Sequence, residues 1–174
     1  MFAEGLRTLY GYNRWATERV LAAATGLPAE QLLTPGQAGR GSVRDTLVHL
    51  VSAQRGWLAW WDGSLSGNEA YGERLNPADF PDLATLRREW EAVQARTEAF
   101  VAGLDEDDLA RTYAETTPDG TPFQMPLWQM LLHVANHGTQ HRSEVAAMLT
   151  PIGHSPGDLD LLDYCWHRGQ GTSG

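Results

Sequence analysis

The chain has 174 residues, which is enough for one well-buried core and too short for two ordinary domains. Hydrophobic residues make up 42% of it and seven residues are tryptophan, a composition typical of a packed globular protein and not of a disordered one. Acidic residues outnumber basic ones by 22 to 13, and the resulting formal charge of −9 disfavours binding to nucleic acid or to an anionic membrane surface.

The cellular location is predicted from three further features. The single cysteine, Cys165, cannot form an intramolecular disulfide and fits a reducing compartment. The first residues, MFAEGLRTLYGY, lack the basic region and apolar run of a secretion signal. No apolar run approaches the ~18–20 residues that are needed to span a bilayer. We therefore expect a soluble, cytoplasmic protein.

The first two long helices are predicted from apolar stripes at helical spacing. Residues 2–24 form the first, with an inward stripe of Leu6, Leu9, Tyr10, Asn13, Ala16, Val20 and Ala24. A short turn, PAEQLL, follows. Ser42 then opens the second helix, and Asp45 stands three residues later, as in a capping box. The seam of this helix, in alternating steps of four and three, is Val43, Leu47, Leu50, Gln54, Trp57 and Trp61.

The second half of the chain predicts two more long helices and a hairpin. Residues 62–82 are rich in Gly, Asn, Pro and Asp and predict a long loop, of the kind that often forms a functional edge or lid. The third helix starts near Asp82. Alternating residues around Asp119-Gly120 predict a small β-hairpin. Pro126 suits the first turn of the fourth long helix, which Thr150-Pro151 ends.

Four amphipathic helices without βαβ alternation predict an all-α protein, an up-down four-helix bundle. The small β-hairpin precedes the last long helix, and a weaker amphipathic segment, residues 157–169, predicts a short C-terminal helix. We expect residues 1–168 to form a single domain and the last residues, 169–174 (GQGTSG), to be disordered.

Three of the six histidines lie at steps of four in HVANHGTQHRSEV, residues 133–145. On the fourth helix His141 occupies the seam and His137 lies at its edge, at the spacing by which one helix offers two imidazoles to one ion. The second helix adds His49, beside a seam residue. Three protein ligands and an open position are typical of catalytic metal sites. The alternative is that each buried imidazole only hydrogen-bonds a carbonyl.

The other histidines fit this pattern less well. His133 could pair with His137, but it points further from the seam, so a supporting or exposed role is favoured. His154 and His167 lie outside the core pattern and are given no site role. Because Gly138 follows His137, the chain lacks the glutamate of the His-Glu-x-x-His proteases, and peptide hydrolysis by that mechanism is not expected.

Three further side chains have two interpretations each. Trp57 and Trp61 could wall an apolar pocket below His49, although packing in the core is the commoner role of such residues. Asn13, on the seam of the first helix, could orient a ligand or simply bond the backbone. For all three we favour the structural role.

Three segments resemble, in order, three blocks of the DinB-like (DinB/YfiT) family: YNRWATERVL (12–21), TLVHLVSAQRGWL (46–58) and LLHVANHGTQHRSEVAAML (131–149). The resemblance implies a four-helix bundle, often dimeric, with a divalent metal held by three histidines that match His49, His137 and His141 here. Members with known activity are thiol S-transferases or isomerases that use bacterial low-molecular-weight thiols, or are proposed hydrolases. The chain departs from the family at Arg142-Ser143-Glu144, where relatives commonly read Arg-Gly-Gln. Because this change lies outside the three ligands, we expect it to affect substrate or interface details.

Two functions follow from the sequence. In the first, His49, His137 and His141 hold Zn²⁺ or Ni²⁺, and the protein is a thiol S-transferase or hydrolase that acts on a small molecule, with a low-molecular-weight thiol as a possible cosubstrate. In the second, the protein is a non-catalytic, metal-stabilised stress-response or binding module. The family resemblance also implies a homodimer.

Overall fold

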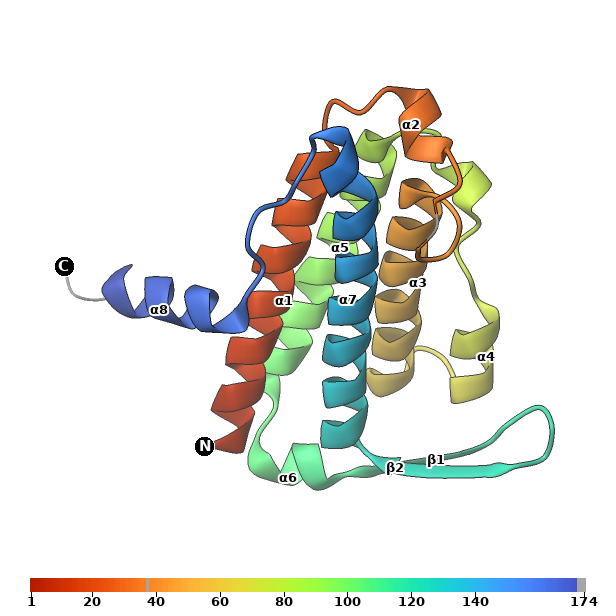
Figure 1. Cartoon of the computed structure of the whole chain (residues 1–174). Coiled ribbons are helices and arrows are strands. Elements are labelled where there is room, and N and C mark those ends of the chain that lie inside the picture. The colour runs from red at the N-terminus through yellow and green to blue at the C-terminus, as the bar shows by residue number, and fades with distance from the viewer. Residues whose placement is uncertain (37, 172–174) are drawn as a thin grey trace.

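The computed structural model describes residues 1–36 and 38–171. Within these residues, four long helices form a bundle: α1 (Phe2–Ala24), α3 (Val43–Trp61), α5 (Leu83–Gly103) and α7 (Leu127–Leu149) (Figure 1). The short elements are α2 (Ala29–Leu33), α4 (Gly67–Gly72), η1 (Pro77–Asp79), α6 (Glu106–Ala110), β1 (Thr112–Thr116), β2 (Pro122–Pro126), η2 (Thr150–Ile152) and α8 (Leu161–Gly171). The predicted four-helix bundle with a small hairpin before its last long helix is confirmed.

The directions of the four helices follow from two clusters of buried side chains. At one end of the bundle the core contains Leu21, Val43, Leu86 and Leu149, one from each long helix. At the other end it contains Leu6, Trp61, Val101 and Leu127. The chain therefore runs along α1 and α7 in one direction and along α3 and α5 in the other (Figure 1). The up-down order predicted for the four helices is wrong, because the consecutive long helices α3 and α5 are parallel. Residues 62–82 make this possible by returning the chain along the length of the bundle.

Side-chain caps fix the starts of two long helices. Ser42 Oγ accepts a hydrogen bond from the backbone N–H of Asp45 at 3.1 Å, which is half of the predicted capping box. The Asp45 carboxylate accepts instead from Arg44 Nε at 3.0 Å. Asp82 caps α5 through the N–H of Thr85 at 2.7 Å. Pro126 is the last residue of β2 and the N-cap of α7, one position before the first turn where the sequence placed it.

The segment 62–82, predicted as a loop, contains the helix α4 and the turn η1. Ser66 and Glu69 form a complete capping box at the start of α4, which explains how so short and glycine-rich a segment becomes helical. Two hydrogen bonds join α4 to β1: Gly67 N–H donates to Glu115 Oε2 at 3.1 Å, and Asn68 Nδ2 donates to the carbonyl of Thr116 at 2.8 Å. The helix α4 and the hairpin therefore form one continuous wall beside α3 (Figure 1).

The hairpin pairs β1 and β2 antiparallel, from Thr112 opposite Pro126 to Thr116 opposite Pro122. Its turn lies where the sequence predicts it. Gly120 has a φ of 86°, a conformation that suits glycine, and Thr117 N–H donates to the carbonyl of Thr121 at 2.9 Å.

The C-terminal helix α8 projects to one side of the bundle (Figure 1) and packs on α1 through Tyr164, whose ring lies 6.0 Å from that of Tyr12 and 5.6 Å from that of Trp15. Tyr12 also donates its hydroxyl proton to the carbonyl of Leu159, just before α8, at 2.8 Å. The helix begins at Leu161 and continues to Gly171. Residues 169–171, for which the sequence predicts disorder, are therefore helical, and residues 172–174 lie outside the described part of the chain. None of the described helices is long and apolar enough to cross a bilayer.

Close backbone packing of α4 on α3 depends on Gly56. A Cβ atom at this position would lie 2.9 Å from the carbonyl oxygen of Ala70, a distance that real Cβ atoms essentially never show. The absence of a side chain at Gly56 thus fixes how closely α4 approaches.

We expect Gly56→Ala to destabilise the protein. Alanine gains ~1 kcal/mol of helix propensity, but overpacking against backbone costs ~1–3 kcal/mol, so the free energy of unfolding should fall by up to about 2 kcal/mol in urea titrations. Gly5→Ala on α1 is the matched control, because nothing lies within 4 Å of its added Cβ. Equal stability changes in the two variants would contradict close packing at Gly56.

Candidate metal centre

Three imidazole rings meet between α3 and α7. Nε2 of His137 lies 3.1 Å from Nε2 of His49 and 3.1 Å from Nε2 of His141. One nitrogen from each ring lies within 4.8 Å of the other two. Within the described residues, this is the one group of three histidine, cysteine or acidic side chains close enough to share an ion. The structure thus brings together the three histidines selected from the sequence.

The spacing of these nitrogens fits a shared cation better than a hydrogen-bonded cluster. A tetrahedral ion with metal–nitrogen bonds of ~2.0–2.1 Å places its ligand atoms ~3.3 Å apart. Without an ion, Nε2 of His137 faces two nitrogens at 3.1 Å, but it carries either one proton or one lone pair and can satisfy only one of them. A divalent cation accepts a lone pair from all three rings, and imidazole donors suit both zinc and nickel.

Burial favours the neutral form of His49 and His137. Desolvation, with the charge of Arg40 as the next contribution, lowers the pKa of His49 to about 4. Desolvation, followed by the neighbouring His141, lowers the pKa of His137 to about 4 as well. Neutral imidazole is the form that ligates metals. At neutral pH both rings therefore hold a lone pair ready for an ion.

Glu144 orients the third ring. Nδ1 of His141 lies 2.6 Å from Glu144 Oε2, so Nδ1–H donates to the carboxylate and the lone pair stays on Nε2. Burial raises the pKa of Glu144, but hydrogen bonds from Gln140 and His141 outweigh it and hold this pKa below its ordinary value. From the sequence, the change at 142–144 is expected to affect substrate or interface details. The structure places Glu144 directly on a candidate ligand, and the spacing of three residues from His141 was the available signal.

We expect Glu144→Ala to weaken zinc binding by ~10–100-fold, the usual effect of removing a carboxylate that orients a histidine ligand. Competition with a chromophoric chelator measures this affinity. Ser143→Ala is the control, since its hydroxyl donates only to the backbone carbonyl of Thr139. Unchanged zinc affinity in the Glu144 variant would show that this hydrogen bond does not support the site.

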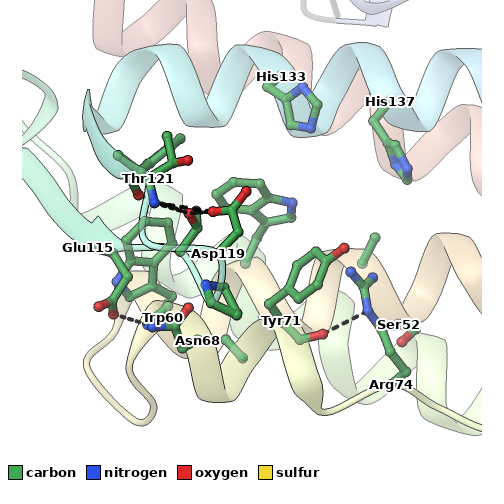
Figure 2. Close-up of a pocket in the computed structure, with 18 of the residues that line it drawn as sticks. Ser52, Trp60, Asn68, Tyr71, Arg74, Glu115, Asp119, Thr121, His133 and His137 are labelled. Atoms are coloured by element: carbon green, nitrogen blue, oxygen red, sulfur yellow. Dashed lines mark hydrogen bonds between the residues drawn. The ribbon is translucent and has the colours of Figure 1, made fainter.

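The three histidines adjoin a cavity of about 760 Å³, here called the aromatic cavity, which His49 and His137 line. It lies between α3, α4, α7 and the hairpin. Figure 2 shows His137 directed into the cavity from α7. Its apolar wall includes Trp57, Trp60 and Phe123. Cavities of this size commonly bind small molecules. Two of the three histidines thus lie beside a cavity with room for a small molecule.

The two tryptophans considered in the sequence have different roles. Trp57 packs against the core, as favoured from the sequence, and it also lines the cavity. Its ring lies 5.7 Å from that of Trp60, a second tryptophan of the cavity that the sequence pattern did not indicate. Trp61 is buried in the core and stacks on Phe100 with ring centroids 6.1 Å apart.

The remaining candidates stay outside the centre. His133 is exposed and lines the cavity, with its ring 5.5 Å from Trp57 and 6.0 Å from His137 (Figure 2). His154 Nδ1 lies 3.1 Å from the carbonyl of Ala23, and His167 is exposed on α8. Asn13 has a structural role, although its partner is the side chain of Arg142 and not the backbone.

The chain is similar in sequence to proteins from two bacteria. The chain is 25% identical over 154 residues to Protein DinB of Bacillus subtilis (strain 168), covering 87% of this chain and 88% of that protein. It is 30% identical over 138 residues to a Geobacillus kaustophilus (strain HTA426) protein named as a putative metal-dependent hydrolase, covering 72% and 74% of the two chains.

Two solved structures have the same fold. YfiT from Bacillus subtilis, described as a probable metal-dependent hydrolase with an unusual four-helix bundle topology, superposes with a TM-score of 0.68 at 18% identity, over 86% of this chain and 89% of that one. A DinB family member from Shewanella denitrificans gives a TM-score of 0.60 at 14% identity, over 92% and 88%. The model of the DinB family matches residues 1–172. The chain therefore belongs to the DinB family.

Proposed function

We propose that the protein is a metal-dependent enzyme that acts on a small molecule at the centre formed by His49, His137 and His141, by hydrolysis or by thiol S-transfer. The observation that carries the proposal is that three Nε2 atoms converge beside the aromatic cavity. Zn²⁺ or Ni²⁺ held there would lower the pKa of a water or thiol at its open position toward neutrality.

The chain's own residues would prepare this reaction. His49 and His137 present the centre to the cavity, and Glu144 holds His141 in the ligating tautomer. Trp57 and Trp60 provide an apolar surface that excludes water and holds the body of a substrate. Hydrolysis is supported by the names of two relatives, and thiol transfer by the family resemblance of the sequence.

A non-catalytic, metal-stabilised binding module is the second candidate. In its favour, the two carboxylates that line the cavity are already engaged in the fold: Glu115 accepts a hydrogen bond from Gly67 N–H, and Asp119 accepts one from Thr121 N–H. Both acids serve the hairpin and α4, so neither is placed as an independent general base.

A turnover screen separates the two candidates. Untagged protein is loaded with zinc or nickel and assayed with p-nitrophenyl esters and amides, and with several low-molecular-weight thiols against 1-chloro-2,4-dinitrobenzene. We expect turnover with at least one pair from the loaded protein and none above background from chelator-stripped protein. Equal rates before and after stripping would contradict metal dependence, and no turnover in any combination would favour the binding module.

We also propose a homodimer, on the family resemblance of the sequence. Sedimentation velocity should then give twice the chain mass of 19.2 kDa. A single species at the chain mass would contradict it.

A further inference from the structure

Arg74, just after α4, lines the aromatic cavity, and within the part of the chain that the structure describes only the inner nitrogen of its guanidinium is hydrogen-bonded. Its Nε donates to the carbonyl of Tyr71 at 2.9 Å, and its guanidinium carbon lies 4.6 Å from the centre of the Tyr71 ring. These contacts fix the orientation of the side chain. In Figure 2 the guanidinium and the Tyr71 hydroxyl are both directed toward α7, opposite His133 and His137.

The outer nitrogens of Arg74 have no protein partner within the described residues. Glu73, which precedes Arg74 in the sequence, does not pair with it. Glu73 pairs instead with Arg55 at 3.5 Å, and Arg55 also approaches Glu89 at 4.0 Å. Arg74 makes neither an ion pair nor a hydrogen bond through Nη1 or Nη2. A guanidinium fork with a fixed orientation and free outer donors matches the two oxygens of a carboxylate.

An aromatic strip extends from this end of the cavity toward the hairpin. The ring of Trp57 lies 5.5 Å from His133 and 5.7 Å from Trp60, and Trp60 lies 5.6 Å from Phe123. Rings at such separations form a continuous apolar surface on which a flat group can pack. The strip and Arg74 line the same cavity.

The charges of the cavity limit the anion that it would bind. Glu115 and Asp119 line the cavity at the hairpin, and Arg74 is the one arginine among its described lining residues. At the hairpin end, these two carboxylates would repel the second negative charge of a dianion such as a phosphate monoester. A single carboxylate, held close to Arg74 and away from the hairpin, meets this restriction.

We propose that the aromatic cavity binds a small carboxylic acid with an aromatic or similarly flat apolar body. Arg74 holds the carboxylate, Trp57 and Trp60 pack against the body, and the reacting group lies toward the histidine centre. The placement of the reacting group rests on the proposed function, whereas binding of the acid at Arg74 is measured without turnover.

The test compares phenyl-substituted alkanoates, from benzoate to 5-phenylpentanoate, with their neutral amides. Binding to the zinc-loaded full-length protein is measured by titration calorimetry, and zinc content is determined on each sample. We expect at least one acid to bind about 10–100-fold more tightly than its amide, the range of a charge-assisted bidentate contact. Arg74→Met should abolish this preference and leave amide binding unchanged.

Arg88→Met on α5 is the control, because it removes the same charge from a side chain whose partner is Thr85, outside the cavity. It should keep the preference for acids. The comparison is repeated on chelator-stripped protein, which shows whether the acid binds Arg74 or the zinc ion itself. If the metal centre does not exist, the zinc determination shows no zinc, and binding of the acid at Arg74 is still measured. A preference that survives in Arg74→Met, equal binding of acids and amides, no binding of either, or tighter binding of phenyl phosphate would each overturn the proposal.

Discussion

Replacing His137 with alanine is expected to weaken binding of zinc by ~100-fold or more and to leave purified, untagged protein nearly free of metal. His137 is the central ligand, since its Nε2 lies 3.1 Å from both other Nε2 atoms. Structural zinc sites of zinc-finger peptides bind with ~10–16 kcal/mol spread over about four ligands, so by this measure one ligand contributes about 3 kcal/mol. Elemental analysis should show about one ion per chain in the wild type, and competition with a chelator should give the change in affinity.

His133→Ala is the matched control for this experiment. His133 stands one turn earlier on the same helix and its ring lies 6.0 Å from that of His137, but it is exposed and outside the group of three. It should keep its metal. Circular dichroism of both variants checks that α7 still folds. If both variants keep their metal, or if both lose it, the metal is not held by His49, His137 and His141 in the way proposed here.

The sequence predicts the three histidines because helical spacing and seam position are both local properties. A step of four residues places His137 and His141 on one face of α7, and a position next to Leu50 turns His49 toward the same interior. Once α3 packs against α7, the three side chains meet. Glu144 was not recognised, since the spacing does not show which nitrogen of His141 faces away from the centre.

The cavity could not be predicted in the same way. The helix α4 has two glycines among its six residues and no apolar stripe, and it depends on the capping box at Ser66 and on its contact with Gly56. Its position, and therefore that of Tyr71 and Arg74, is a tertiary effect. The direction of α5 is a similar case, because an amphipathic pattern fixes which face is buried but not which way the helix runs.

The apolar pattern of the sequence also does not predict that an arginine is buried next to the histidine centre. The side chain of Arg142 is 2% exposed and no carboxylate pairs with it within the described residues. Asn13 Oδ1 accepts from its Nη2 at 2.7 Å, and Thr139 Oγ1 accepts from the same nitrogen at 2.9 Å. Desolvation lowers its pKa. Gly138 leaves the necessary room, since a Cβ there would lie 2.8 Å from Nη1.

Asn13→Ala is therefore expected to lower the free energy of unfolding by about 2–3 kcal/mol, because it removes a charge-assisted hydrogen bond and leaves the buried guanidinium of Arg142 under-solvated. Urea denaturation measures the loss. Asn68→Ala is the control: its side chain donates to the carbonyl of Thr116 at 2.8 Å but is exposed, so the change should stay below ~1 kcal/mol.

The double variant Asn13→Ala/Arg142→Met decides whether the buried charge is the cause. Methionine fills most of the volume of arginine without a charge that requires partners, so the double variant should recover more than ~1 kcal/mol relative to Asn13→Ala alone. If the two substitutions instead destabilise additively, the effect of Asn13→Ala comes from lost packing in α1, and the network around Arg142 does not stabilise the fold. Because Arg142 adjoins His141 in the chain, measuring the zinc affinity of the same variants then shows whether the network also holds α7 in the register that the metal centre requires.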